Sequence, residues 1–524
     1  MLQDSEADRI PVSRWLVPLF WLALCCISTI FVAAGLPFVF NDDAYMALPA
    51  IEYAAGRGLS APALAAQFPE FYQNFLVYPP GFTVGLAGWV AAFGHGSLSF
   101  SVFAALSGLV CTLLLYRVLE RVAPDAPLRW VAPLIALPAC IYQGMRPELL
   151  GYPLFLLGCW LLLARPGAVA RVVASLALGL STLCAPTLLG PALLVLVFDL
   201  ARLRGADRAS LVRAGLALCL GGLLAAAALL WMVQGQLLEF ISQFTQHARE
   251  RRTAPGLNLM LMLYLTLVAA SAVILGLGRL LRAQWSGVDT LIAWLSLALL
   301  LSLVTHARQT LSVSLTNLLL LGLLWRASGF LPWPRLARLG GGAAMAGFAG
   351  FLLVANVYAV SKAPYQRFAP GDAARLQAFI AATPPGDRLV VSPVLFRTLL
   401  DGQWPAGAQD LYFLRYWREG HLPEGLADFL PRDRIALTNI DVRTIIQMGF
   451  LRAGDGQAFM APLRDGSGAT EAPLPNLVLR LTVPVQHGLP PRRPLRLCLM
   501  ERPDPSLAGL SAAEALVRIC GGVP

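Results

Sequence analysis

Long apolar stretches, separated by short polar segments, recur along the first 361 residues of this chain. Most of them are close to the roughly 20 residues that an α-helix needs to cross the hydrocarbon core of a bilayer. The pattern predicts about eleven membrane spans. They cover residues 15–37, 98–118, 129–143, 149–164, 169–185, 187–201, 212–233, 259–278, 288–305, 311–326 and 342–361.

The composition agrees with a multi-pass membrane protein. Of 524 residues, 57% are apolar and only 13% are charged, which is too little polar surface for a soluble globule of this size. The net charge of +10 comes from arginines scattered among short loops, so it predicts membrane topology and no nucleic-acid partner. The first apolar stretch lacks a small-residue cleavage site, and we expect it to be retained as a span.

Arginines fall in every second loop, as the positive-inside rule requires when the N-terminus is cytoplasmic. The predicted inside arginines are Arg117, Arg121, Arg129, Arg165, Arg171, Arg202, Arg204, Arg208, Arg213, Arg279, Arg282, Arg326, Arg335 and Arg338. The loop from about Pro37 to Leu98 and everything after Ser361 are then expected outside.

Residues 362–524 differ in pattern and predict a separate periplasmic α/β domain, distinct from a membrane domain at 1–361. Apolar runs shorten to strand length at 388–392 and 476–481, and an amphipathic helix is expected at 373–382. Seven of the nine cysteines lie in or beside spans, where they are expected to pack as small apolar residues. Cys498 and Cys520 lie in the tail, either as a disulfide or as two thiols.

Two adjacent carboxylates, Asp42 and Asp43, follow the first predicted span. Carboxylates at the mouth of a membrane helix resist burial, which favours a role in chemistry or cation binding. The loop that they open predicts a helix over 43–57 that ends at Gly56-Arg57-Gly58, and a second helix over 61–75. After Tyr78-Pro79-Pro80-Gly81, an apolar run at 82–94 is too short for a span and predicts a helix on or re-entering the membrane.

The order of these motifs resembles the GT-C superfamily of glycosyltransferases that use polyprenyl-phosphate sugars. It runs from the first span through Asp-Asp-Ala-Tyr, Gly-Arg-Gly-Leu and Tyr-Pro-Pro-Gly to a later Arg-Pro-Glu. Similar groups are the protein O-mannosyltransferases, lipid A aminoarabinose transferases and arabinofuranosyltransferases. The motifs cover about the first 165 residues, and the rest is similar only in architecture. Asp42 matches the family's catalytic acidic residue and Asp43 its neighbour. Because the spacing to the tyrosine is one residue longer in some groups, either carboxylate is a candidate base.

The resemblance implies an inverting transfer of a sugar from a polyprenyl phosphate to a periplasmic glycan, lipid or protein at the bacterial inner membrane. Such a transfer needs a carboxylate to take the acceptor proton, and cations to stabilise the departing phosphate. The candidate phosphate ligands outside are Arg146, Arg308, His306, Arg249, Arg251 and Arg252. The candidate substrate-binding residues are Tyr45, Tyr78, Glu148 and Glu70.

Each candidate also has a structural interpretation. The acidic pair suits helix capping, Arg146 and Glu148 suit a local ion pair, and His306 and Arg308 suit anchors at the membrane interface. The cluster of Arg249, Arg251 and Arg252 suits anionic headgroups. Glu52 and Glu70 are additional carboxylates, expected to be solvated at the surface.

No metal-binding spacing of His and Cys, Walker loop or dinucleotide fingerprint is present, so we expect no cofactor. A divalent metal at the acidic pair, as in the oligosaccharyltransferase branch, is an alternative that two carboxylates alone do not specify. Other functions left open are a transporter or flippase of a lipid-linked saccharide and a non-catalytic polysaccharide assembly factor. A transporter would carry ionisable residues near the bilayer midplane in related halves.

Overall fold

The structure is a computed structural model, and it divides into two compact units. One comprises Met1–Ala33, Leu76–Gly85 and Ser101–Val357, and the other Ala34–Phe75, Leu86–Phe100 and Tyr358–Pro524. The residues that the structure describes are 16–33, 41–62, 73–122, 130, 133–134, 136–137, 145–164, 167–201, 203, 207–250, 343, 389–391, 409–410, 434–438, 477–479 and 495–501.

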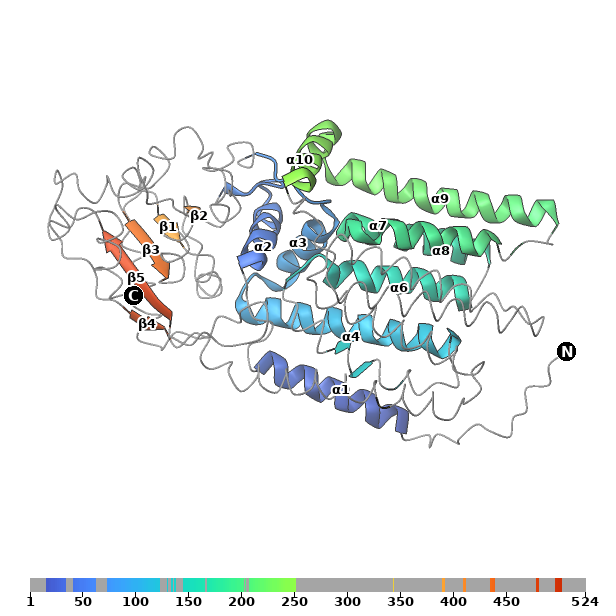
Figure 1. The fold of residues 1–524 in the computed structure, drawn as a ribbon, viewed down its shortest axis with the longest axis horizontal. Coiled ribbons are helices and arrows are strands. Elements are labelled where there is room, and N and C mark those ends of the chain that lie inside the picture. The colour runs from blue at the N-terminus through green and yellow to red at the C-terminus, as the bar shows by residue number, and fades with distance from the viewer. Residues whose placement is uncertain are drawn as a thin grey trace. The chain divides into compact units, whose positions relative to one another are not determined.

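Apolar helices lie side by side in the first unit (Figure 1). They are α1 (Leu16–Ala33), most of α4 (Ser97–Val122), α6 (Glu148–Ala164), α7 (Ala168–Cys184), α8 (Leu189–Ala201) and α9 (Arg208–Met232). A short 3-10 helix, η4 (Pro186–Leu188), immediately precedes α8. These helices confirm the apolar segments predicted between residues 15 and 37 and between 98 and 233, except for 129–143. Most of that segment lies outside the described residues. The spans predicted after residue 258 lie almost entirely outside them.

Small residues allow α7 to pack closely against α6 and α9. A Cβ added at Gly158 of α6 would lie 2.6 Å from Leu178 Cγ, and one at Gly221 of α9 would meet the carbonyl oxygen of Val172. The hydroxyl of Ser175 donates a hydrogen bond of 2.7 Å to the carbonyl of Leu218. Close backbone approach at small residues and hydrogen bonds between helices are the usual means of association in membranes, where apolar burial supplies little.

Two described helical segments, Ser97–Arg121 and Arg208–Met232, are long and apolar enough to cross a bilayer. α9 leaves large apolar side chains exposed along its length, among them Leu216, Leu220, Leu223 and Trp231. An apolar surface of this extent is unfavourable in water and suits contact with lipid. The count of about eleven spans stays a prediction, because the other described apolar helices are shorter than a full span.

Two of the three predicted helices of the first loop are present, with slightly different bounds. α2 covers Asn41–Ala54 and α3 covers Gly81–Phe93. The chain leaves α2 through Gly56 and Gly58, whose φ angles of +77° and +78° favour glycine. Of the predicted helix at 61–75, only residues 61–62 and 73–75 are described, and 73–75 are not helical.

A five-stranded mixed sheet with the order β2-β1-β3-β5-β4 belongs to the second unit. β1 pairs in parallel with β2 and β3, and β5 pairs antiparallel with β3 and β4. The strands are β1 (Leu389–Val391), β2 (Gln409–Asp410), β3 (Arg434–Thr438), β4 (Leu477–Leu479) and β5 (Leu495–Glu501). β1 and β4 fall where the sequence predicts strands. The domain boundary at residue 362 stays a prediction.

The cysteines of the described helices fall into two groups. Cys111, Cys159 and Cys184 are buried, as predicted for packing residues. Cys25, Cys26 and Cys219 are exposed on α1 and α9, so their predicted packing role stays a prediction. Cys498 lies in β5 opposite Leu437. Because Cys520 lies outside the described residues, the disulfide stays a prediction.

Candidate functional site

The acidic pair occupies the first turn of α2, since this helix begins at Asn41. The N-terminus of a helix carries a partial positive charge that favours a nearby carboxylate in its ionised form. A general base must be ionised to accept a proton. Asp42 and Asp43 lie in this first turn, and Tyr45 follows within the next turn of the same helix. The role of either carboxylate as the base stays a prediction.

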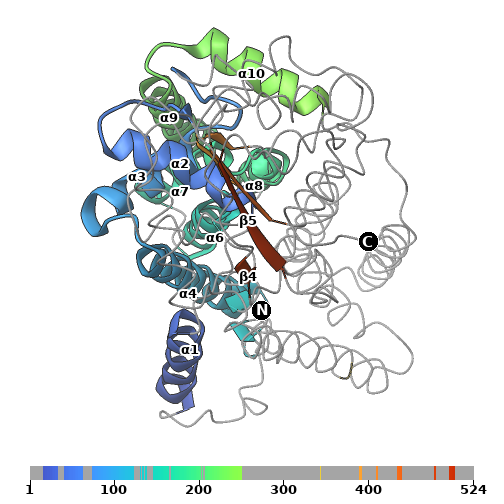
Figure 2. The ribbon, with the colours of Figure 1, turned by 90° about the vertical axis from the view of Figure 1, so that its left-hand side faces the viewer.

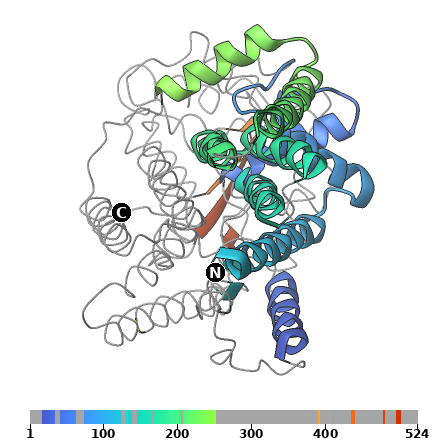
Figure 3. The same cartoon turned by 90° about the vertical axis from the view of Figure 1, so that its right-hand side faces the viewer.

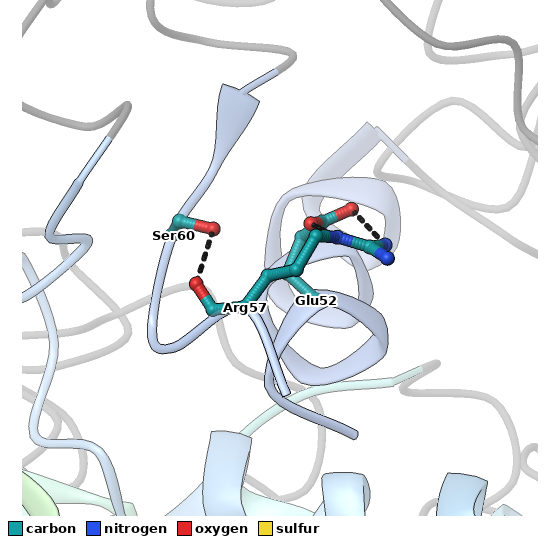
Figure 4. Close-up of polar contacts among 3 residues, drawn as sticks. All are labelled: Glu52, Arg57 and Ser60. Atoms are coloured by element: carbon teal, nitrogen blue, oxygen red, sulfur yellow. Dashed lines mark hydrogen bonds and ion pairs between the residues drawn. The ribbon is translucent and has the colours of Figure 1, made fainter. Parts of the chain in front are cut away.

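The other end of α2 is closed by an ion pair between Glu52 and Arg57 (Figure 4). Nε and Nη2 of Arg57 both donate to the carboxylate of Glu52, and the Nη2–Oε1 distance is 2.9 Å. Hydrogen bonding to Glu52 raises the pKa of the Arg57 guanidinium. The expectation that Glu52 is solvated was wrong, because its side chain is only 14% exposed. The pair ties the turn after α2 back onto the helix and engages Glu52, so Glu52 is not a ready second catalytic carboxylate.

Arg146, Pro147 and Glu148 lead into α6, the first turn of which contains Glu148. The N–H groups of Leu149 and Gly151 donate to the carbonyls of Arg146 and Pro147, at 2.9 and 3.0 Å. Glu148 is buried, and Arg146 is half-buried. A fixed backbone turn thus places Arg146 and the buried carboxylate of Glu148 at the N-terminal end of α6. The role of Arg146 in phosphate binding stays a prediction.

The segment Tyr78-Pro79-Pro80 leads into α3. It lies at the same end of the first unit as the start of α6. A Cβ added at Gly81 would lie 2.7 Å from the carbonyl oxygen of Leu183, near the end of α7. One added at Gly85 would lie 2.7 Å from Leu150 Cδ1, near the start of α6. The structure therefore brings the half-buried Tyr78 and the start of α6 to one end of these helices.

A helix that the sequence analysis did not predict, α10 (Leu237–Glu250), belongs to this end as well. It follows α9 and runs across the direction of that helix, as Figure 2 and Figure 3 show. Its buried Gln243 accepts a hydrogen bond of 2.8 Å from the backbone N–H of Leu76. The signal for this helix is the helical spacing of its apolar residues, at positions 237, 238, 240, 241 and 244. A search for long apolar stretches does not detect it, because polar residues stand between them.

Several predicted site residues lie outside the described residues, and their roles stay predictions. They are Glu70, Arg251, Arg252, His306 and Arg308. Arg249 lies in the last turn of α10. Among the described residues, no group of three or more His, Cys, Asp or Glu side chains is arranged to hold a metal ion.

Arg171, predicted on the cytoplasmic side, has a partner that the sequence analysis did not predict. It lies in α7 and pairs with Asp199 of α8, with Nε 2.6 Å from Oδ2 and side chains only 10% and 2% exposed. A cation that is paired in the protein interior is explained by packing as well as by topology.

No protein-family model and no curated protein matches the chain. Among solved structures, it is similar to the crystal structure of ArnT from Cupriavidus metallidurans in the apo state, with 14% identity and a TM-score of 0.49 over 94% of this chain and 99% of that one. It is also similar to ArnT from the same organism bound to undecaprenyl phosphate, with 15% identity and a TM-score of 0.46 over 83% of this chain and 95% of that one. At such identity neither structure assigns a role to a residue of this chain.

Proposed function

We propose that this chain is an inverting glycosyltransferase of the GT-C type that moves a sugar from a polyprenyl phosphate to a periplasmic acceptor. The observation that carries the proposal is the acidic pair in the first turn of α2, the helix that follows the apolar helix α1 in the sequence. The resemblance implies short juxtamembrane helices in this loop, and α2 and α3 occur there between α1 and α4.

In this proposal Asp42 takes the proton of the acceptor hydroxyl while the sugar carbon develops positive charge, and Asp43 is the alternative base. The acceptor oxygen forms the new glycosidic bond from the face opposite the phosphate, and the bond to the phosphate oxygen breaks. The polyprenyl phosphate leaves with the electron pair. The donor's growing negative charge is then stabilised by cations, for which Arg146 is the best-placed described candidate.

The distribution of charge favours a transferase over a transporter. Among the described apolar helices α1, α4, α6, α7, α8 and α9, charged residues stand within about two turns of a helix end. Residues that carry ions or polar substrates across a membrane usually lie near its midplane in broken helices. The proposal accordingly places the protein in a bacterial inner membrane, with its N-terminus in the cytoplasm and its C-terminal region in the periplasm.

Substitution of each carboxylate in turn tests the proposed base. Asp42→Asn keeps the size and the hydrogen-bonding oxygen of the side chain but removes its basicity, so we expect transfer to fall about a hundredfold or more. Asp43→Asn is the matched variant one residue along the helix. Loss in Asp43→Asn alone would move the role of base to Asp43, whereas full activity in both variants would remove the central assignment.

A further inference from the structure

Gln243 joins two segments that are 167 residues apart in sequence. Its Oε1 accepts the backbone N–H of Leu76 at 2.8 Å, in a buried environment. A buried backbone N–H that loses its acceptor is costly, because no water replaces it. The contact therefore fixes the distance between α10 and the segment that leads into Tyr78.

The orientation of the Gln243 amide is itself fixed. Nε2 donates to Oε1 of Glu239, one turn earlier on α10, at 3.0 Å. A carboxylate oxygen accepts only from the NH₂ side of an amide, so this bond directs the other side, Oε1, toward Leu76. The two hydrogen bonds need one donor and one acceptor on the side chain at position 243, and an amide supplies both. An apolar contact would not need either group.

The segment is held at its other end too. Five residues after Leu76, Gly81 packs against the backbone of Leu183, where an added Cβ would lie 2.7 Å from the carbonyl oxygen. Between these two points stand Tyr78 and two prolines, and proline fixes φ near −65°. Little freedom remains for Tyr78 once both ends are in place.

We propose that Gln243 is a positioning residue for the donor. It holds α10 to the Tyr78 segment and thereby fixes two predicted donor contacts together. These are Tyr78 and Arg249, which lies in the last turn of α10. This inference rests on the proposed glycosyltransferase function and adds to it the contact between α10 and the Tyr78 segment. The reacting groups stay those assigned above.

Four variants test the proposal in the full-length protein. Gln243→Leu removes the acceptor for Leu76. Gln243→Glu keeps an acceptor but places a second carboxylate beside Glu239. The exchange Glu239→Gln with Gln243→Glu restores one amide and one carboxylate in reversed positions. Ser242→Ala, an exposed position on the same helix, is the control.

Amide hydrogen exchange of residues 73–78 reports the contact, and kcat and KM for a polyprenyl-phosphate sugar report its consequence. We expect Gln243→Leu to speed exchange at Leu76 about tenfold or more and to lower kcat/KM about tenfold, as misplacement of substrate contacts does. The reversed pair should recover most of both, and Ser242→Ala should change neither. Rescue by the reversed pair separates positioning from a general loss of fold.

Unchanged exchange at Leu76 in Gln243→Leu would overturn the contact. Faster exchange with unchanged kcat/KM would overturn the positioning role. Failure of the wild-type protein to transfer any sugar would instead contradict the proposed function, and the exchange measurement would still decide whether the contact exists.

Discussion

Nε of Arg171 lies 2.6 Å from Oδ2 of Asp199, so that an ion pair joins the beginning of α7 to the end of α8. Removal of one partner from a buried pair leaves the other charge uncompensated. We therefore expect Asp199→Asn to lower the free energy of unfolding by about 3–5 kcal/mol, measured by thermal or denaturant unfolding in detergent.

The exposed pair of Arg117 and Glu120 provides the control, with Nη1 3.1 Å from Oε2. Glu120→Gln should cost no more than about 1 kcal/mol, because solvent screens the pair. Equal effects of the two substitutions would show that the Arg171 pair is not buried in the folded protein.

Two glycines of α9 predict opposite outcomes for the same substitution. At Gly221 a Cβ would meet the carbonyl oxygen of Val172 and lie 2.8 Å from Cβ of Ser175, whereas nothing lies within 4 Å of one at Gly215. Gly221→Ala should destabilise the protein by about 1–3 kcal/mol through overpacking. Gly215→Ala should be neutral or stabilise it by up to about 1 kcal/mol through helix propensity. Melting temperatures of the two variants check the packing of α7 against α9, which equal shifts would contradict.

Sequence pattern predicted the apolar helices well, since each of α1, α4, α6, α7 and α9 is a nearly unbroken apolar run bounded by polar residues. It missed α10, whose apolar face alternates with polar residues. It also missed long-range pairing. Nothing local to Arg171 indicates a partner at Asp199, and nothing local to Leu76 indicates Gln243.

For the candidate site, the sequence predicted that a short helix begins at the acidic pair. α2 begins there, at Asn41. The pairing of Glu52 with Arg57 was not expected, although the two residues are five apart. It depends on the turn at Gly56, where the chain bends so that the N–H of Arg57 donates to the carbonyl of Glu52.

The membrane topology predicted from the distribution of arginines is tested by reporter fusions. A reporter that is active only in the periplasm should be active when fused after Ser361 and silent when fused near Arg204. The reverse result would place the acidic pair in the cytoplasm, where nucleotide sugars are available, and would contradict a polyprenyl-phosphate donor.

Substitution of the arginines that are predicted outside distinguishes phosphate binding from a purely structural role. Arg146→Gln and Arg308→Gln should slow turnover more than they weaken donor binding, because the phosphate gains charge as the glycosidic bond breaks. Turnover, donor affinity and melting temperature should be measured together for each variant. Unchanged turnover per folded molecule in both would direct the search for the phosphate site to Arg249, Arg251 and Arg252.

The most direct test of the central claim is the fate of the donor lipid. Purified protein, reconstituted in vesicles with a panel of labelled polyprenyl-phosphate sugars and with extracted envelope acceptors, should release free polyprenyl phosphate in step with labelled product. Asp42→Asn should release neither at a comparable rate. A donor that crosses the bilayer with its glycosidic bond intact would identify a transporter. A donor that is bound but never cleaved, across the panel, would contradict the glycosyltransferase assignment.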